Sequence, residues 1–178
     1  GEERYEDPAD QALADAATET EVISCADREG DIYEVFSEWH QRLQCGQPVA
    51  EWIIRCNQDR RLAKNKDPNA EACRKLREQV QASALLGTLT VNIDAKEQLK
   101  KIKGGNRKKV KRSARSAVLE VRACTVTLHP PYRKGTRLPE VSFQVVMATE
   151  IDPPENEDPI EWVLLTSLAV LDFDAAVG

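Results

Sequence analysis

Residues Val22-Ile-Ser-Cys-Ala-Asp-Arg-Glu-Gly-Asp-Ile-Tyr-Glu-Val-Phe36 join a short apolar run to a helical pattern. The run at 22–26 predicts a buried strand, and the apolar spacing that follows predicts a helix over 31–43 with one apolar face. Asp27 falls at the carboxyl end of the strand, where open α/β sheets place ligands and metals. An Asp at such a turn is also a common helix N-cap, so the residues alone leave both interpretations open.

The rest of the chain predicts a βαβ portion followed by a β-rich portion. A second β-rich run at 52–56 comes after a Gly-Gln-Pro segment that ends the helix, and this spacing implies two parallel strands. A further helix is expected over 69–86. Alternating patterns predict antiparallel strands at 88–93, 117–128 and 141–149, and one more strand is expected at 160–167. The predicted fold class is therefore α/β.

Composition excludes several classes of protein. With 178 residues, 41% hydrophobic and 31% charged, the chain can form one domain or a compact part of a larger one. Its apolar runs are far shorter than the roughly 18 residues of a membrane-spanning helix. The five cysteines form no Cys-x-x-Cys pair, and only two histidines are present, which argues against structural zinc. Reduced and mostly buried thiols are expected.

Charge is distributed very unevenly. The net charge is −5, yet residues 96–115 hold ten Lys or Arg against one Glu, so the remainder carries −14. Charge runs are usually solvated faces, but this density in an acidic chain favours contact with a DNA backbone. No aromatic residue interrupts the run, so base stacking there is not supported. The candidate contacts around and after the Gly104-Gly105-Asn106 turn signal are Lys108, Lys109, Lys111, Arg112 and Arg115.

The run Cys25-Ala-Asp-Arg-Glu-Gly-Asp-Ile-Tyr33 resembles the segment around the second catalytic aspartate of bacterial transposases of the insertion-sequence-four family, which includes the transposase of transposon five. The resemblance continues in order through four further segments, from about residue 20 nearly to the end of the chain. Five motifs in order make an unrelated α/β domain a poor alternative. The other four are Glu51-Trp-Ile-Ile-Arg55, Lys111-Arg-Ser-Ala-Arg-Ser-Ala117, Ile151-Asp-Pro-Pro154 and Ile160-Glu-Trp-Val-Leu-Leu-Thr-Ser167.

The resemblance implies a domain organisation. Residues 21–86 would be a partial RNase H-like core, and residues 87–170 a β-rich insertion with the basic loop 96–115. An acidic segment at 1–20 and the start of a helix at 171–178 flank them. Because the chain begins with Gly and stops where that helix has only begun, we expect it to be the middle part of a longer catalytic domain.

The resemblance also implies cut-and-paste DNA transposition, with Asp27 as a metal ligand and the second acid of an Asp-Asp-Glu triad. Two Mg²⁺ ions (or Mn²⁺) held by carboxylates neutralise charge on the attacking and leaving oxygens of a phosphodiester. Since the other two triad members are not found here, the chain alone is expected to be inactive. The implied partners are double-stranded transposon ends and a second copy in a full-length homodimer, in the bacterial cytoplasm. The alternative is a catalytically dead remnant that binds DNA nonspecifically.

Three further residues have a role in the family and an ordinary interpretation. Arg55 is similar to a phosphate-contacting arginine, but a surface arginine at a strand end is equally common. Trp162 matches a tryptophan that stacks on a flipped base, whereas an apolar neighbourhood makes a core tryptophan the default. Glu29 would either orient a water molecule bound to the metal, or act only as an acidic residue in the first helical turn, where the helix dipole favours it.

Overall fold

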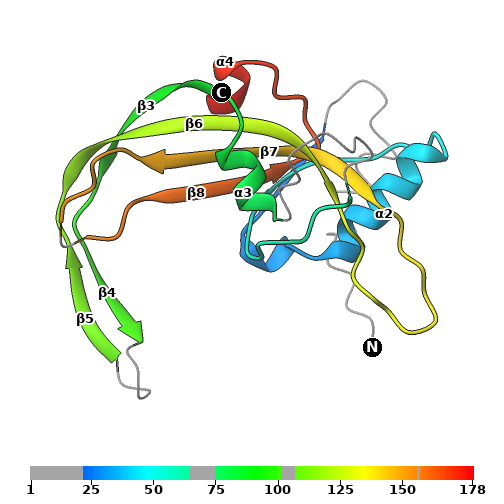
Figure 1. Ribbon diagram of the computed structural model, residues 1–178, viewed down its shortest axis with the longest axis horizontal. Coiled ribbons are helices and arrows are strands. Elements are labelled where there is room, and N and C mark those ends of the chain that lie inside the picture. The colour runs from blue at the N-terminus through cyan, green and yellow to red at the C-terminus, as the bar shows by residue number, and fades with distance from the viewer. Residues whose placement is uncertain (1–21, 65–74, 102–106, 156) are drawn as a thin grey trace.

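The fold is a mixed α/β arrangement with few helices around one six-stranded sheet (Figure 1). The computed structural model describes residues 22–64, 75–101, 107–155 and 157–178. The sheet has the order β1-β2-β8-β7-β6-β3, and β4 and β5 form a separate pair. The strands are β1 Ile23–Ala26, β2 Glu51–Arg55, β3 Leu85–Ile93, β4 Lys96–Lys101, β5 Arg107–Arg112, β6 Arg115–Leu128, β7 Val141–Glu150 and β8 Glu161–Thr166.

The predicted βαβ unit is confirmed, but its first strand β1 is mostly exposed and not buried as predicted, because it lies at the edge of the sheet. Strands β1 and β2 pair in parallel, with Cys25 beside Ile53. The short 3₁₀ helix η1 (Arg28–Gly30) and helix α2 (Tyr33–Gln44) connect them. Helix α2 ends because Gly46 adopts the left-handed conformation, with φ of 65°, and donates its N–H to the carbonyl of Leu43 at 3.0 Å.

The helix predicted over 69–86 is only partly correct. Helix α3 spans Leu76–Gln81, and residues 69–74 of the prediction lie outside the described part of the chain. Leu85 instead belongs to β3, where it pairs with Arg122. The side chain of Arg122 donates to the Ser83 carbonyl at 2.6 Å, so tertiary contacts after α3 outweigh the helical spacing of the apolar residues.

The remaining strand pairs are antiparallel, as the alternating patterns predict. Strand β2 pairs with β8, β8 with β7, β7 with β6, and β6 with β3. The sheet therefore runs continuously across the boundary predicted between residues 86 and 87. Strand β8 comes from the predicted insertion and lies directly beside β2 of the predicted core portion.

Apolar side chains form two clusters, because even and odd residues of the long strands face opposite sides of the sheet. The larger cluster packs α2 and α3 against β2, β7 and β8, with Phe36, Trp52 and Phe143 in mutual ring contact. The smaller cluster packs helix α4 (Phe173–Val177) near β3 and β6. Asp172 caps α4 by accepting from the N–H of Ala175 at 2.9 Å, so a helix does begin where the sequence predicts it.

Cysteine burial differs from the prediction. Cys25 and Cys45 are exposed, because Cys25 lies on an outer strand and Cys45 just after α2; Cys73 lies outside the described residues. Cys56 is buried, and burial raises the pKa of its thiol to about 11. Within the described ranges, no helix is both long and apolar enough to span a membrane.

Candidate active site

Asp27 and Arg55 meet at the carboxyl ends of the two parallel strands. Strand β2 ends at Arg55, and Asp27 directly follows the last residue of β1. Arg55 Nη1 lies 3.6 Å from Asp27 Oδ1, and the two side chains are 41% and 73% exposed. The prediction that both lie at the same edge of the sheet is confirmed. An exposed carboxylate beside an exposed guanidinium is an arrangement that can meet both a cation and a phosphate.

Asp27 does not act as a conventional side-chain cap. It precedes η1 with an extended backbone, and its carboxylate makes no capping hydrogen bond to that helix. Glu29 lies within η1 and is exposed. Gly30 lets η1 fold back onto the strand ends, since a Cβ at this position would lie 2.7 Å from the Cβ of Ala26. The turn therefore leaves the Asp27 carboxylate exposed, with Arg55 as its ion-pair partner.

A buried ion pair, which the sequence did not reveal, holds this edge together. The Asp31 side chain is fully buried, and its Oδ2 accepts from the backbone N–H groups of Asn57 and Gln58 at 2.7 and 2.8 Å. Its Oδ1 accepts from Nε and Nη2 of Arg60 at 2.8 and 2.5 Å. This contact joins the segment after β1 to the segment after β2, so it fixes the two strand ends relative to each other. No local spacing signals a pair 29 residues apart.

Trp162 is not a core residue. Its side chain is 38% exposed in β8, so the interpretation as a buried core tryptophan is wrong. Arg55 pairs with Leu164, and Trp162 lies two residues from Leu164 on the same strand. Arg55 and Trp162 are therefore diagonal neighbours on one face of the sheet, within reach of long side chains. Asp27, Arg55 and Trp162 thus lie along one edge.

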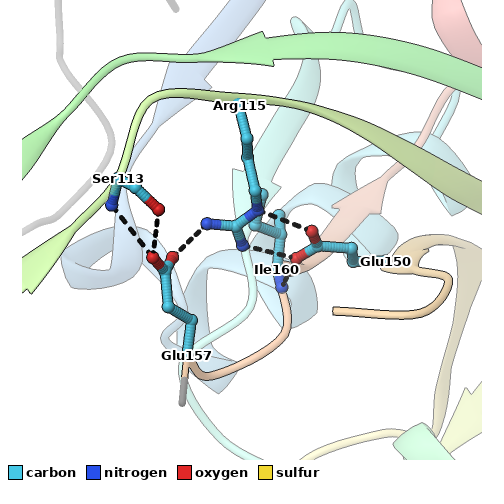
Figure 2. A network of polar contacts seen from close by, with 5 residues as sticks. All are labelled: Ser113, Arg115, Glu150, Glu157 and Ile160. Carbon is cyan, nitrogen blue, oxygen red and sulfur yellow. Dashed lines mark hydrogen bonds and ion pairs between the residues drawn. The ribbon is translucent and has the colours of Figure 1, made fainter. Parts of the chain in front are cut away.

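Arg115 is removed from the predicted DNA contacts. Its side chain is only 12% exposed, and its Nε and Nη2 donate to the two carboxylate oxygens of Glu150 at 2.8 Å each (Figure 2). Its Nη1 donates to Glu157. Two carboxylates neutralise this guanidinium inside the protein, so it is not available to a phosphate. The pattern of charges at 96–115 does not distinguish Arg115, its last member, from the cations before it.

The same network connects two parts of the chain that carry candidate residues. Glu157 accepts from the backbone N–H of Ser113 at 3.0 Å and from its hydroxyl, while Ile160 donates its N–H to Glu150 at 2.9 Å (Figure 2). The hydrogen bond from Arg115 holds the pKa of Glu150 below its usual range. The hydrogen bonds from Ser113 hold the pKa of Glu157 below its usual range. The base of the basic segment is thereby tied to the residues just before β8.

The basic segment forms a two-stranded ribbon that extends away from the sheet (Figure 1). In its backbone register, Lys96 is paired with Arg112, Lys100 with Lys108, and Lys101 with Arg107, while Glu97 is paired with Lys111. Like charges in directly opposite positions destabilise a strand pair, and an anionic partner removes that repulsion. The side chains of Lys108, Lys109, Lys111 and Arg112, and the turn at residues 102–106, lie outside what the structure describes.

The predicted metal site has one candidate ligand in this chain, Asp27. Among the residues that the structure describes, no group of three or more His, Cys, Asp or Glu side chains is placed to hold a metal ion. Asp27 is a single carboxylate, whereas two magnesium ions need several oxygen ligands. These residues therefore do not by themselves fit a complete two-ion site. No model of a known protein family matches this chain.

Proposed function

We propose that this chain is part of the catalytic domain of a DNA transposase of the insertion-sequence-four family. Its βαβ unit would belong to an RNase H-like core, and Asp27 would be the second acid of the catalytic triad. The observation that carries the proposal is the exposed pair of Asp27 and Arg55 at the ends of adjacent parallel strands, 3.6 Å apart. The Asp27 carboxylate caps no helix and stays exposed beside Arg55, so a ligand can reach both side chains.

The proposed role of each residue follows from its position. Asp27 would provide one ligand for Mg²⁺ or Mn²⁺, and the bound ions would neutralise charge on the reacting phosphodiester. Arg55 would contact a phosphate close to that ligand. Trp162, on the same face, would stack on a base extruded from the duplex, since stacking is worth about 1–3 kcal/mol per base. Glu29 remains a candidate for orienting a metal-bound water.

The basic ribbon of β4 and β5 supports DNA as the partner. Eight of its twelve strand residues are Lys or Arg, and phosphates would neutralise this density of charge. In the proposed enzyme this ribbon would contact the transposon end, and the complete protein would act as a homodimer in the bacterial cytoplasm. The proposed DNA contacts of the ribbon are therefore Lys108, Lys109, Lys111 and Arg112, and Arg115 is not among them.

The decisive experiment is Asp27→Asn in the product of the complete coding sequence. We expect Mg²⁺-dependent cleavage and strand transfer to be lost, while DNA-binding affinity and the urea midpoint stay nearly unchanged. Asp27 is 73% exposed, so its amide should not disturb folding. Full cleavage activity in the variant would refute the catalytic role. An equal loss of cleavage and binding would show a structural role instead.

A second candidate is a DNA-binding module without catalysis, in which the basic ribbon of β4 and β5 would be the DNA contact. Both candidates predict that this 178-residue chain binds DNA without cutting it. Binding should weaken steeply with salt, and replacing Lys108, Lys109, Lys111 and Arg112 by Gln should flatten the slope of log affinity against log salt by up to about 3.6. An unchanged slope would show that the ribbon is only a solvated surface. Cleavage by the product of the complete coding sequence separates the two candidates.

A further inference from the structure

The loop between β6 and β7, residues 129–140, presents an aromatic ring among cations. The Tyr132 side chain is 87% exposed, Lys134 is exposed within a tight turn, and Arg137 is exposed just after that turn. Within the described ranges, no carboxylate forms an ion pair with Lys134 or Arg137. A large ring this exposed gains nothing from the core, so burial does not explain its presence.

The loop is held in a defined conformation at its base. The hydroxyl of Tyr33 donates to the carbonyl of Pro139 at 2.7 Å, and burial raises the pKa of this hydroxyl to about 12, so it stays a donor. Arg133 Nε donates to Glu34 Oε1 at 2.8 Å. The backbone N–H of His129 donates to the carbonyl of Arg61 at 3.0 Å. An ordered loop loses less conformational entropy when it binds a partner.

The turn at its tip is also built into the backbone. Arg133 and Thr136 form an isolated bridge, with the N–H of Thr136 donating to the Arg133 carbonyl at 3.3 Å. Gly135 has φ of 81°, which an L side chain rarely adopts. Lys134 lies within this turn, and Tyr132 and Arg137 flank the bridged pair that closes it.

The location of the loop relates it to the candidate active site. Tyr33 and Glu34, which hold it, form the first turn of α2, and this turn follows Asp27 and η1. The basic ribbon lies at the opposite end of β6, and in Figure 1 the ribbon and the loop both extend toward the lower side of the view. Strand β6 has 14 residues, so its path between the ribbon and the loop is about 45 Å long.

We propose that the 129–140 loop is a second DNA contact, in which Tyr132 stacks on an unpaired base and Lys134 and Arg137 contact neighbouring phosphates. An exposed ring and two exposed cations in one loop match a base and its neighbouring phosphates, whereas an acidic peptide offers no counterpart for the ring. The inference rests on the proposed function, because it takes DNA as the partner. It adds a contact at the end of β6 remote from the ribbon.

The test measures binding of the 178-residue chain to a fluorescent 20-nucleotide oligothymidine and to a blunt 20-bp duplex. Tyr132→Ala should weaken binding to the single strand about tenfold, and Tyr132→Phe should restore it, since the ring remains. Leu171→Ala, at a side chain that is 85% exposed, is the matched control and should change nothing. The double change of Lys134 and Arg137 to Gln should lower the salt slope on the single strand by about 1.4.

The outcomes distinguish failure of the loop proposal from failure of the proposed function. If Tyr132→Ala binds like the unchanged chain while the ribbon substitutions weaken binding, the loop proposal is overturned and the proposed function stands. If the unchanged chain binds neither DNA, both are overturned. If polyglutamate displaces the single strand as well as unlabelled DNA of equal charge, the loop selects an acidic polymer and the DNA assignment fails. Because Tyr132 is so exposed, melting curves of its variants should coincide, and a shifted curve would itself contradict the surface role.

Discussion

Replacing Arg60 by Ala should destabilise the protein strongly, because the Asp31 carboxylate would remain buried without its cation. The side chain of Asp31 is fully buried and that of Arg60 is 11% exposed. Breaking a buried ion pair by removing one partner costs about 3–5 kcal/mol. The backbone N–H groups of Asn57 and Gln58 would still donate to the carboxylate, which places the electrostatic part near 3 kcal/mol.

Arg60 also contributes through its contact with aromatic rings. Its guanidinium carbon lies 5.6 Å from the ring centre of Phe36 and 6.0 Å from that of Tyr33. Such contacts add about 0.5–1 kcal/mol. The free energy of unfolding should therefore fall by about 3–4 kcal/mol. With an m-value near 2 kcal/mol per molar urea, the unfolding midpoint should fall by about 2 M.

The assay is urea unfolding at pH 7, followed by tryptophan fluorescence and circular dichroism. Arg61→Ala is the matched control, since the neighbouring side chain is exposed and its substitution should stay within about 0.5 kcal/mol. Adding Asp31→Asn to Arg60→Ala should cost less than the sum of the two single changes, because the stranded charge is gone. A loss below about 1 kcal/mol in Arg60→Ala, or strict additivity in the double variant, would refute this account of the strand ends.

Two further predictions concern the other contacts. The pKa values of Glu150 and Glu157 lie below their usual range in the folded protein, so their stabilising contribution is complete above about pH 4.3 and is lost as the pH falls further. Acid unfolding curves should therefore be steeper for the unchanged chain than for Glu150→Gln, and equal steepness would show that the network of Arg115 contributes nothing. Trp162→Ala should cost clearly less in urea unfolding than Trp52→Ala, whose side chain is 3% exposed and whose loss should cost about 3–5 kcal/mol. Similar losses at the two positions would restore a core role for Trp162.

Local patterns in the sequence were sufficient for most of the strands and for helix α2. The period of two in residues 117–128 and 141–149 depends only on which face of the sheet each side chain meets, so alternation reveals it directly. The placement of Asp27 beside Arg55 was also predictable, because parallel strands joined by one helix must end at the same edge. The end of α3 was not, since the pairing of Leu85 with Arg122 connects residues far apart in the chain.

Which polar side chains face inward was decided by tertiary structure alone. Arg115 follows a run of lysines and arginines and looks the same as its neighbours in the sequence. In the folded chain, two carboxylates enclose it, one at the carboxyl end of β7 and one in the loop that follows β7. Trp162 sits among apolar residues and still remains partly exposed, because only part of that face of the sheet is covered. Periodicity tells which residues share a face, whereas burial depends on which distant segment packs over that face. For this reason the sequence alone determined the strands and the position of Asp27, and only the folded chain separated the candidate ligand contacts from the residues that hold them in place.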